Sequence, residues 1–148
     1  MKWRGSSDGN LKCTTWGSPN TSSEWRSLGT TVLAGTVTLS QKQYVCQIIE
    51  KHRMSDAKPV TTPMDPNVVL TKWSKAPKDN RASNLYAAAI GSLMYAAIGT
   101  RPDISFAVQT LSQFSQNPGP DHWVALKRVL RYLQGTQGLG LTYGGALS

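Results

Sequence analysis

Three stretches with helical periodicity follow one another between residues 86 and 136. In each, apolar side chains recur every three or four positions, a spacing that places them on one face of an α-helix. The predicted inward faces are Tyr86, Ile90, Leu93, Met94, Ala97 and Ile98, then Ile104, Ala107, Val108, Leu111 and Phe114, then Trp123, Leu126, Val129, Leu130 and Leu133. The pattern predicts three helices that share one core.

The ends of these helices carry capping signals. Gly99 and Gly135 stand where helices commonly end. Thr100 is expected to cap the second helix, with Pro102 in its first turn, where the missing N–H does no harm. The Asn-Pro-Gly-Pro run at residues 117–120 is a strong break before the third helix. The three helices are therefore predicted as separate elements.

Two further elements are predicted upstream. Residues 28–39 hold two β-branched runs around an Ala-Gly pair, which indicates a tight β-hairpin. A helix should follow over residues 40–55, with Ser40 as N-cap and Gln43 completing a capping box. The four prolines of residues 56–81 exclude a long helix and predict a loop. Part of that loop, residues 58–63, could form a short edge strand.

The predicted fold class is mainly α with a small β portion (α+β). It comprises a hairpin, one helix, a Pro-rich loop that carries several lysines, and a three-helix bundle. Residues 28–143 form the expected domain. Residues 1–27, rich in Gly, Ser, Thr and Asn and without a period, are expected to be a disordered tail, and residues 144–148 a second tail.

The excess of positive charge indicates a class of possible partner. Lys and Arg number 16 against 8 Asp and Glu, so the formal net charge is +8. Such an excess favours a polyanionic partner, although a solvated basic surface without any partner has the same composition. On the third predicted helix, Lys127, Arg128 and Arg131 fall on the side away from the leucines. They predict a surface that contacts phosphates without reading sequence. Arg101 could join it, or could pair with Asp103.

Catalytic chemistry is not apparent. The eight acids are isolated from one another in the sequence, whereas two-metal catalysis needs clustered carboxylates. No Gly-rich phosphate loop is present, and the two cysteines and two histidines lack the spacing of a zinc site. Cys46 lies in an apolar run and is expected to be buried. His122 beside Asp121 is no dyad, because adjacent helix residues point apart. The expectation is no catalytic residue, no metal and no cofactor.

The sequence has no apolar run long enough to cross a bilayer and no signal peptide. It therefore predicts a protein without a membrane partner that stays inside the cell, in the cytoplasm or nucleus, and is not secreted.

Six blocks, in order along the chain, resemble a known family. They are LSQKQYV at residues 39–45, PVTTPM at 59–64, IGSLMYA at 90–96, TRPDISFAV at 100–108, LSQF at 111–114 and HWVALKRVLRYLQGT at 122–136. Together they are similar to the later part of the reverse transcriptase of copia-type LTR retrotransposons, within the Pol polyprotein. The resemblance covers residues 28–143.

The resemblance implies a position between the catalytic palm and ribonuclease H. The family's Tyr-x-Asp-Asp motif would precede this block, where residues 1–27 show no such motif, and the ribonuclease H carboxylates would follow it. The resemblance therefore implies a truncated fragment without enzyme activity. The full-length enzyme of the family would need divalent metal, which this fragment is not expected to bind. The implied role is thumb-like gripping of a template–primer duplex, with other parts of Pol as further partners.

Two alternatives remain open from the sequence. Small residues at Ala87, Gly91 and Ala96 leave a slim helix face, which would suit a protein-interaction or oligomerisation module. The chain could also be a remnant of a transposon without function.

Overall fold

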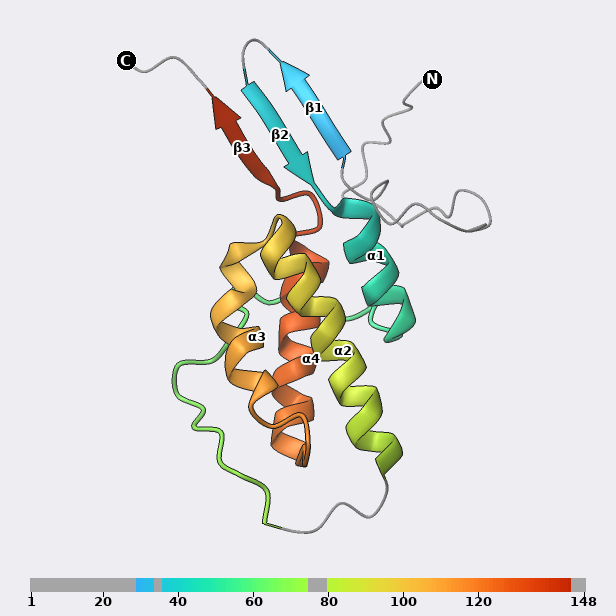
Figure 1. Ribbon diagram of the computed structural model, residues 1–148, viewed down its shortest axis with the longest axis vertical. Helices are drawn as coiled ribbons and strands as arrows, with labels where there is room; N and C mark the ends of the chain where they lie inside the picture. The colour runs from blue at the N-terminus through green and yellow to red at the C-terminus, as the bar shows by residue number, and fades with distance from the viewer. Residues whose placement is uncertain (1–28, 34–35, 75–79, 145–148) are drawn as a thin grey trace.

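The computed structural model describes residues 29–33, 36–74 and 80–144 (Figure 1). The elements in chain order are β1 (Gly29–Leu33), β2 (Thr36–Ser40), α1 (Lys42–Lys51), α2 (Asn80–Gly99), the 3-10 turn η2 (Pro102–Ile104), α3 (Ser105–Ser112), α4 (Pro120–Gly135) and β3 (Leu141–Gly144). The predicted class, mainly α with a small β portion, is confirmed. Residues 1–27 and 145–148 of the predicted tails lie outside the described residues, whereas Gly144, predicted in the second tail, is the last residue of β3.

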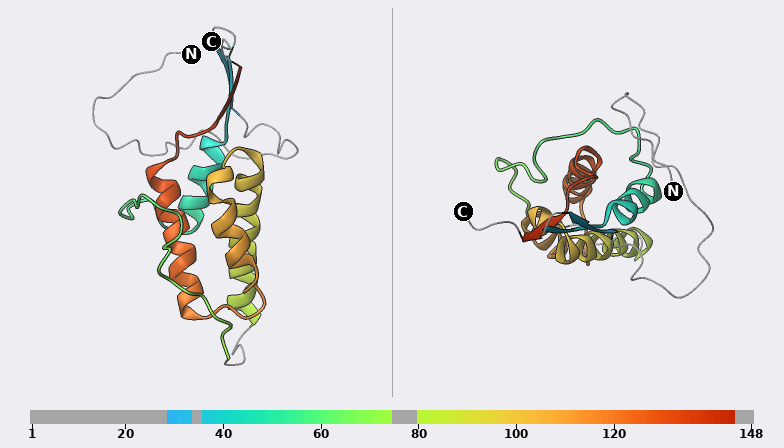
Figure 2. Two further views of the ribbon diagram at one scale, coloured as in Figure 1. Left: turned by 90° about the vertical axis from the view of Figure 1, so that its left-hand side faces the viewer. Right: turned by 90° about the horizontal axis from the view of Figure 1, so that it is seen from above.

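The four α-helices enclose one core. Seen from above in Figure 2, α2 and α3 run side by side along one layer, while α1 and α4 lie on its other side. Contacts join α2 to α3, α3 to α4, α4 to α1 and α1 to α2, so the helices form a closed ring. The three helices predicted from residues 86–136 therefore share their core with α1.

Most of the predicted inward side chains are buried. Tyr86, Leu93, Ile104, Val108 and Leu133 are fully enclosed, and the Tyr86 hydroxyl donates to the carbonyl oxygen of Leu111 at 3.1 Å. Tyr86 also meets the half-buried Trp123 edge to face, with ring centroids 5.2 Å apart. Aromatic contact and hydrogen bond together orient α2 against α3 and α4.

One predicted inward residue is wrong. Ile98 is 79% exposed, and Met94 is only partly buried. The buried stripe of α2 passes instead through Ala96 and Ala97. Each helical residue turns by about 100°, so Ile98 lies about 200° around the helix axis from the fully buried Ala96 and points away from the core.

A three-stranded antiparallel sheet extends beyond one end of the helices (Figures 1 and 2). The predicted hairpin is confirmed as β1 and β2, with Gly29 opposite Ser40 and Leu33 opposite Thr36. β3 pairs with the other edge of β2, and Thr38 and Thr142 face each other with hydroxyl oxygens 3.0 Å apart. The last described segment of the chain thus folds back onto the hairpin.

Two predicted helix caps are wrong. Ser40 is the last residue of β2, and α1 begins after Gln41 without a side-chain cap. The hydroxyl of Thr100 donates to Oε1 of the buried Gln41 at 3.0 Å, so it caps no helix. Both hydroxyl-bearing residues lie where α2 meets the base of the hairpin, and tertiary contacts there override the local capping preference. α1 also ends earlier than predicted, at Lys51.

Residues 55–74 form an irregular segment, which we call the strap. It contains no strand, so the edge strand considered for residues 58–63 is wrong. Figure 2 shows the strap running along α4, and side chains of α4 rather than a neighbouring strand bind its carbonyl oxygens, as detailed below. Lys75 and Lys78, predicted in the same basic loop, lie outside the described residues.

Gly140 provides a test of the junction between α4 and β3. A Cβ atom at Gly140 would collide with the carbonyl oxygen of Leu39, whereas one at Gly138 would meet nothing within 4 Å. A backbone oxygen cannot move aside as easily as the end of a flexible side chain can. We therefore expect Gly140→Ala to lower the free energy of unfolding by about 1–3 kcal/mol, measured by urea denaturation. Gly138→Ala, the matched control, should stay within about 0.5 kcal/mol of wild type; equal effects of the two would contradict the predicted close approach.

Candidate nucleic-acid interface

The outer side of α4 is bound to the strap by side-chain hydrogen bonds. Gln134 donates to the carbonyl oxygen of Ser55 at 2.7 Å, and Nε of Arg131 donates to that of Lys58 at 2.7 Å. Near the other end of α4, Nδ2 of Asn117 donates to the carbonyl oxygen of Trp73 at 2.9 Å. The strap thus runs antiparallel to α4, and these donors satisfy carbonyls that regular structure would otherwise pair.

Arg128 binds the middle of the strap. Its Nη2 donates to the hydroxyl of Thr62 at 2.9 Å, and its Nη1 lies 3.4 Å from the carboxylate of Asp65. Both charged side chains are about one-third exposed. Arg128 and Arg131, two of the predicted phosphate-binding residues, therefore already have contacts inside the chain.

Lys127 differs from its two neighbours. It is exposed, and within the described residues it has neither a hydrogen bond nor an ion pair. Of the three cations predicted on α4, therefore, only Lys127 presents its whole charge to solvent.

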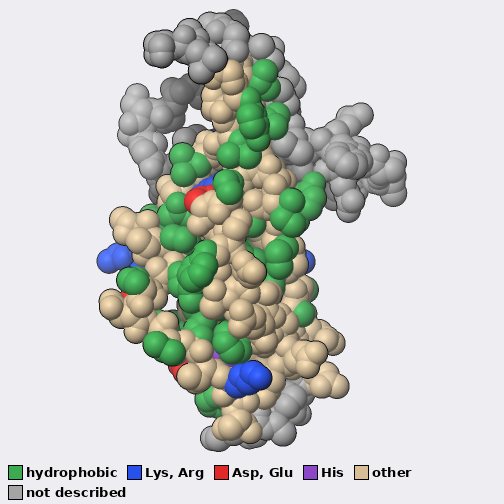
Figure 3. All heavy atoms as spheres, turned by 60° about the vertical axis from the view of Figure 1, so that its left-hand side comes forward, with side chains coloured by type: hydrophobic (Ala, Val, Ile, Leu, Met, Phe, Trp, Pro, Cys, Tyr) green, Lys and Arg blue, Asp and Glu red, His purple; other side chains and the backbone are tan. Residues whose placement is uncertain are grey.

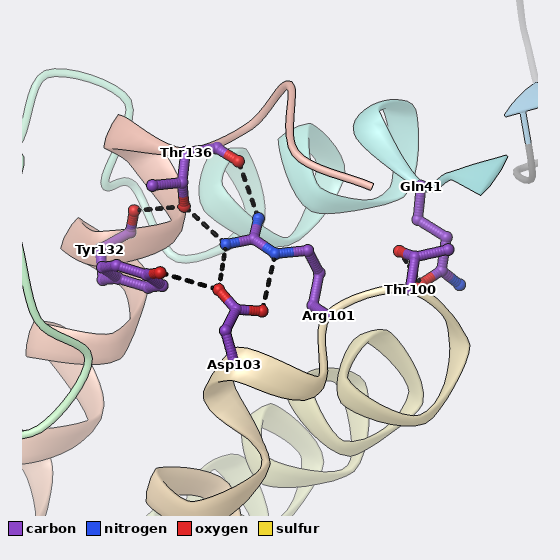
Figure 4. Close-up of polar contacts among 6 residues, drawn as sticks. All are labelled: Gln41, Thr100, Arg101, Asp103, Tyr132 and Thr136. Carbon is purple, nitrogen blue, oxygen red and sulfur yellow. Dashed lines mark hydrogen bonds and ion pairs between the residues drawn. The ribbon is translucent and has the colours of Figure 1, made fainter. Parts of the chain in front are cut away.

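Arg101 lies elsewhere, as the buried member of a polar cluster at the end of α4 (Figure 4). Its side chain is 1% exposed and forms a two-pronged pair with Asp103, with Nε to Oδ1 at 3.0 Å and Nη2 to Oδ2 at 2.8 Å. Nη1 donates to the carbonyl oxygen of Thr136 at 2.8 Å, and Nη2 donates to its hydroxyl at 2.6 Å. Of the two roles considered for Arg101, the structure has the pairing with Asp103, so Arg101 is not part of an exposed cationic surface.

The charge of Asp103 is stabilised by its neighbours. Burial alone would raise the pKa of this carboxyl. Hydrogen bonds from Arg101 and Tyr132, together with the positive charge of Arg101, outweigh burial and hold the pKa below its ordinary value. Burial and the hydrogen bond to Asp103, 2.8 Å long, raise the pKa of Tyr132. The cluster therefore keeps a charged carboxylate and a neutral phenol.

His122 has a structural role that the sequence reasoning missed. Its side chain is almost fully buried and stacks on Phe114, with ring centroids 4.1 Å apart. Nδ1 accepts from the N–H of Gly119 at 2.7 Å, which satisfies an orphan donor at the start of α4. Nε2 lies 3.0 Å from the carbonyl oxygen of Thr71 in the strap. The available signal was its place as third residue of a helix that opens with Gly-Pro, where a side chain can fold back onto the cap.

Within residues 29–33, 36–74 and 80–144, no group of three or more His, Cys, Asp or Glu side chains gathers to hold a metal ion. None of the helices described is both long and apolar enough to cross a bilayer. Cys46 is buried, as predicted. These features define a mainly α domain with one cationic helix, clasped by an irregular strap.

Comparison with known proteins relates this domain to transposon polyproteins. The sequence is 46% identical over 112 residues, 73% of the chain, to the retrovirus-related Pol polyprotein from transposon TNT 1-94 of Nicotiana tabacum. It is also 46% identical over 114 residues, 74% of the chain, to that from transposon RE2 of Arabidopsis thaliana. The chain spans only 8% of the length of each. It is therefore homologous to a short segment of these Pol polyproteins, which confirms the broader part of the resemblance.

A third relative has a different description. Over 58 residues, 39% of this chain and 41% of the relative, the sequence is 57% identical to secreted RxLR effector protein 161 of Plasmopara viticola. No family model and no solved structure matches the chain. The location inside the cell and the assignment to the thumb side of a reverse transcriptase stay predictions.

The Asp103 cluster predicts a pH dependence of stability. Because the carboxyl has a lower pKa in the folded chain, its stabilising contribution is complete above the unfolded-state pKa and is lost as the pH falls through the folded-state pKa. We expect Asp103→Asn to lower the free energy of unfolding by about 1–3 kcal/mol near neutral pH, with the difference from wild type shrinking in acid. Urea denaturation across that range measures it. Asp121→Asn, at an exposed acid in the first turn of α4, is the control; a gap for Asp103→Asn that stays constant with pH would contradict the prediction.

Proposed function

We propose that this chain is a segment from the thumb side of a transposon reverse transcriptase and that it binds an RNA, DNA or hybrid duplex through the phosphate backbone. The observation that carries the proposal is the exposed Lys127 on α4, beside Arg128, in a chain with a net charge of +8. Cations on one side of a helix can follow a phosphate backbone, and such contacts carry no sequence information.

The proposed binding is modest and strongly dependent on salt. Each cation that neutralises a phosphate releases condensed counterions, so affinity falls as the salt concentration rises. The ion pair of Arg128 with Asp65 and the hydrogen bond of Arg131 to Lys58 reduce what these two side chains offer to a duplex. Lys127 should therefore contribute most among the three.

The homology also suggests the wider setting of this role. Two relatives are named Pol polyproteins, and the segment matched is a small fraction of each. In our proposal the segment binds the duplex and contributes no catalytic residue of its own. Its expected protein partners are the remaining parts of such a polyprotein.

Lys127→Glu tests the proposed interface. The substitution reverses the one positive charge on α4 that binds nothing else in the described residues, so we expect weaker duplex binding at low salt and a slope of log affinity against log salt that is smaller by about 1. Fluorescence anisotropy with two unrelated duplex sequences measures both quantities. Lys42→Glu, at the start of α1 and with the same change in net charge, should have a smaller effect. Wild-type protein that fails to bind at low salt, or equal losses in both variants, would refute the interface.

A second candidate function is favoured by the α2–α3 layer. Within α2 and α3 the one charged residue is Arg81, and two large apolar side chains are exposed, Ile98 by 79% and Phe106 by 73%. On the face shown in Figure 3, hydrophobic and uncharged polar side chains predominate. Such a surface suits protein–protein contact. The slim face predicted at Ala87 and Gly91 is also exposed, but Ala96 is in the core.

Sedimentation velocity separates the two functions. If the α2–α3 layer mediates self-association, wild-type protein should form a dimer as its concentration rises, and Phe106→Glu should weaken that dimer by about tenfold or more, since the charge would be buried in an apolar contact. Lys127→Glu should leave the dimer unchanged. A monomer at all concentrations would argue against an oligomerisation module.

A further inference from the structure

Arg128 already binds a group that resembles a phosphate. The Asp65 carboxylate and the Thr62 hydroxyl of the strap occupy its guanidinium, which in the proposed function faces a duplex. A carboxylate and a phosphate oxygen are interchangeable partners for arginine in geometry and charge. The strap therefore places an internal competitor at the nucleic-acid interface.

The competitor satisfies Arg128 incompletely. Asp65 lies 3.4 Å from Nη1, longer than a strong charged hydrogen bond. Within the described residues the buried Nε of Arg128 has no hydrogen-bond partner. Ion pairs as exposed as this one contribute little to stability, so a duplex phosphate that engages Arg128 at closer range could displace the carboxylate.

The strap is anchored at its two ends and more weakly between them. At one end Pro59 packs against Gly135, where a Cβ atom would lie 2.9 Å from the proline ring. At the other end Thr71 and Trp73 are bound by His122 and Asn117. Between the anchors, Val68 and Val69 are 47% and 83% exposed, and Met64 is the one large apolar side chain of residues 60–69 that packs, partly buried, against the core. A segment held by so few apolar contacts opens locally at a lower cost in free energy than a core element does.

We propose that the middle of the strap, residues 60–69, is an autoinhibitory clasp that covers Arg128 with Asp65 and opens when a nucleic-acid backbone takes its place. The inference rests on the proposed function, since it concerns the regulation of that same interface. In the closed state Lys127 makes the first contact with phosphate, and Arg128 joins once Asp65 has left.

Asp65→Asn tests the clasp. The amide can still accept from the backbone N–H of Asn67, which in wild type donates to Asp65 Oδ1 at 3.1 Å, so the turn should survive. Loss of the carboxylate should raise duplex affinity by about two- to fivefold, the range expected for an exposed ion pair. Asp56→Asn is the matched control, because it removes the same charge from an exposed position of the same strap. Anisotropy titrations at fixed low salt compare the two.

A double-mutant cycle assigns the gain to Arg128. In an Arg128→Gln background, Asp65→Asn should no longer raise affinity relative to Asp56→Asn. Hydrogen exchange provides a second readout: duplex should speed exchange at the amides of Asn67 and Val68, which donate within the closed turn.

The outcomes separate the clasp from the function beneath it. If wild type binds duplex and loses affinity in Lys127→Glu, yet Asp65→Asn and Asp56→Asn bind equally, the clasp is overturned and the interface stands. A gain that persists with Arg128→Gln likewise overturns the clasp. If no variant binds duplex at low salt, the proposed function itself fails, and the clasp with it.

Discussion

The ion pair between the buried Arg101 and the partly exposed Asp103 joins the end of α2, the start of α3 and the end of α4. Arg101 follows the last turn of α2, Asp103 lies in η2, and the guanidinium reaches across to Thr136 just beyond α4. A guanidinium that is 1% exposed must have its charge and its donors matched within the protein. The two-pronged pair and the Thr136 contacts do this, and in doing so they place the end of α4 against the turn between α2 and α3.

A neighbouring polar contact extends this junction to the sheet. Thr100, next to Arg101, donates to the buried Gln41, which connects β2 to α1. The hairpin and α4 are therefore connected through Thr100 and Arg101, two consecutive residues of the turn after α2. This connection explains why Thr100 does not cap a helix, because its hydroxyl binds Gln41 between β2 and α1.

The sequence was most informative where a periodic pattern and a sharp break coincide. The helical faces around Tyr86, Val108 and Leu130 and the hairpin at the Ala-Gly pair were predictable, because each depends on spacing along the chain. Most partners of polar side chains were not predictable. The pairing of Arg101 with Asp103 was one of two alternatives, because the two residues are close in sequence. The contacts of Arg101 with Thr136, of His122 with Gly119 and Thr71, and of Arg131 with Lys58 in the strap were not expected, because exposed cations and isolated histidines give the same sequence pattern.

The strap determines which cations of α4 are available to a partner. From sequence, Lys127, Arg128 and Arg131 form one cationic surface, and charge alone does not distinguish them. In the fold, Arg131 supports a carbonyl that has no strand partner, Arg128 is held by a carboxylate, and Lys127 is exposed. The proline-rich composition of the strap is the reason, because a segment that cannot pair as a strand still needs donors for its carbonyl oxygens. Helix α4 supplies those donors from the same side that would meet a phosphate backbone, so stability of the strap and affinity for a polyanion depend on overlapping side chains. A change that raises the affinity for a polyanion is therefore expected to weaken the strap, and a change that stabilises the strap is expected to lower that affinity. Regulation of the interface thus depends on the fold itself.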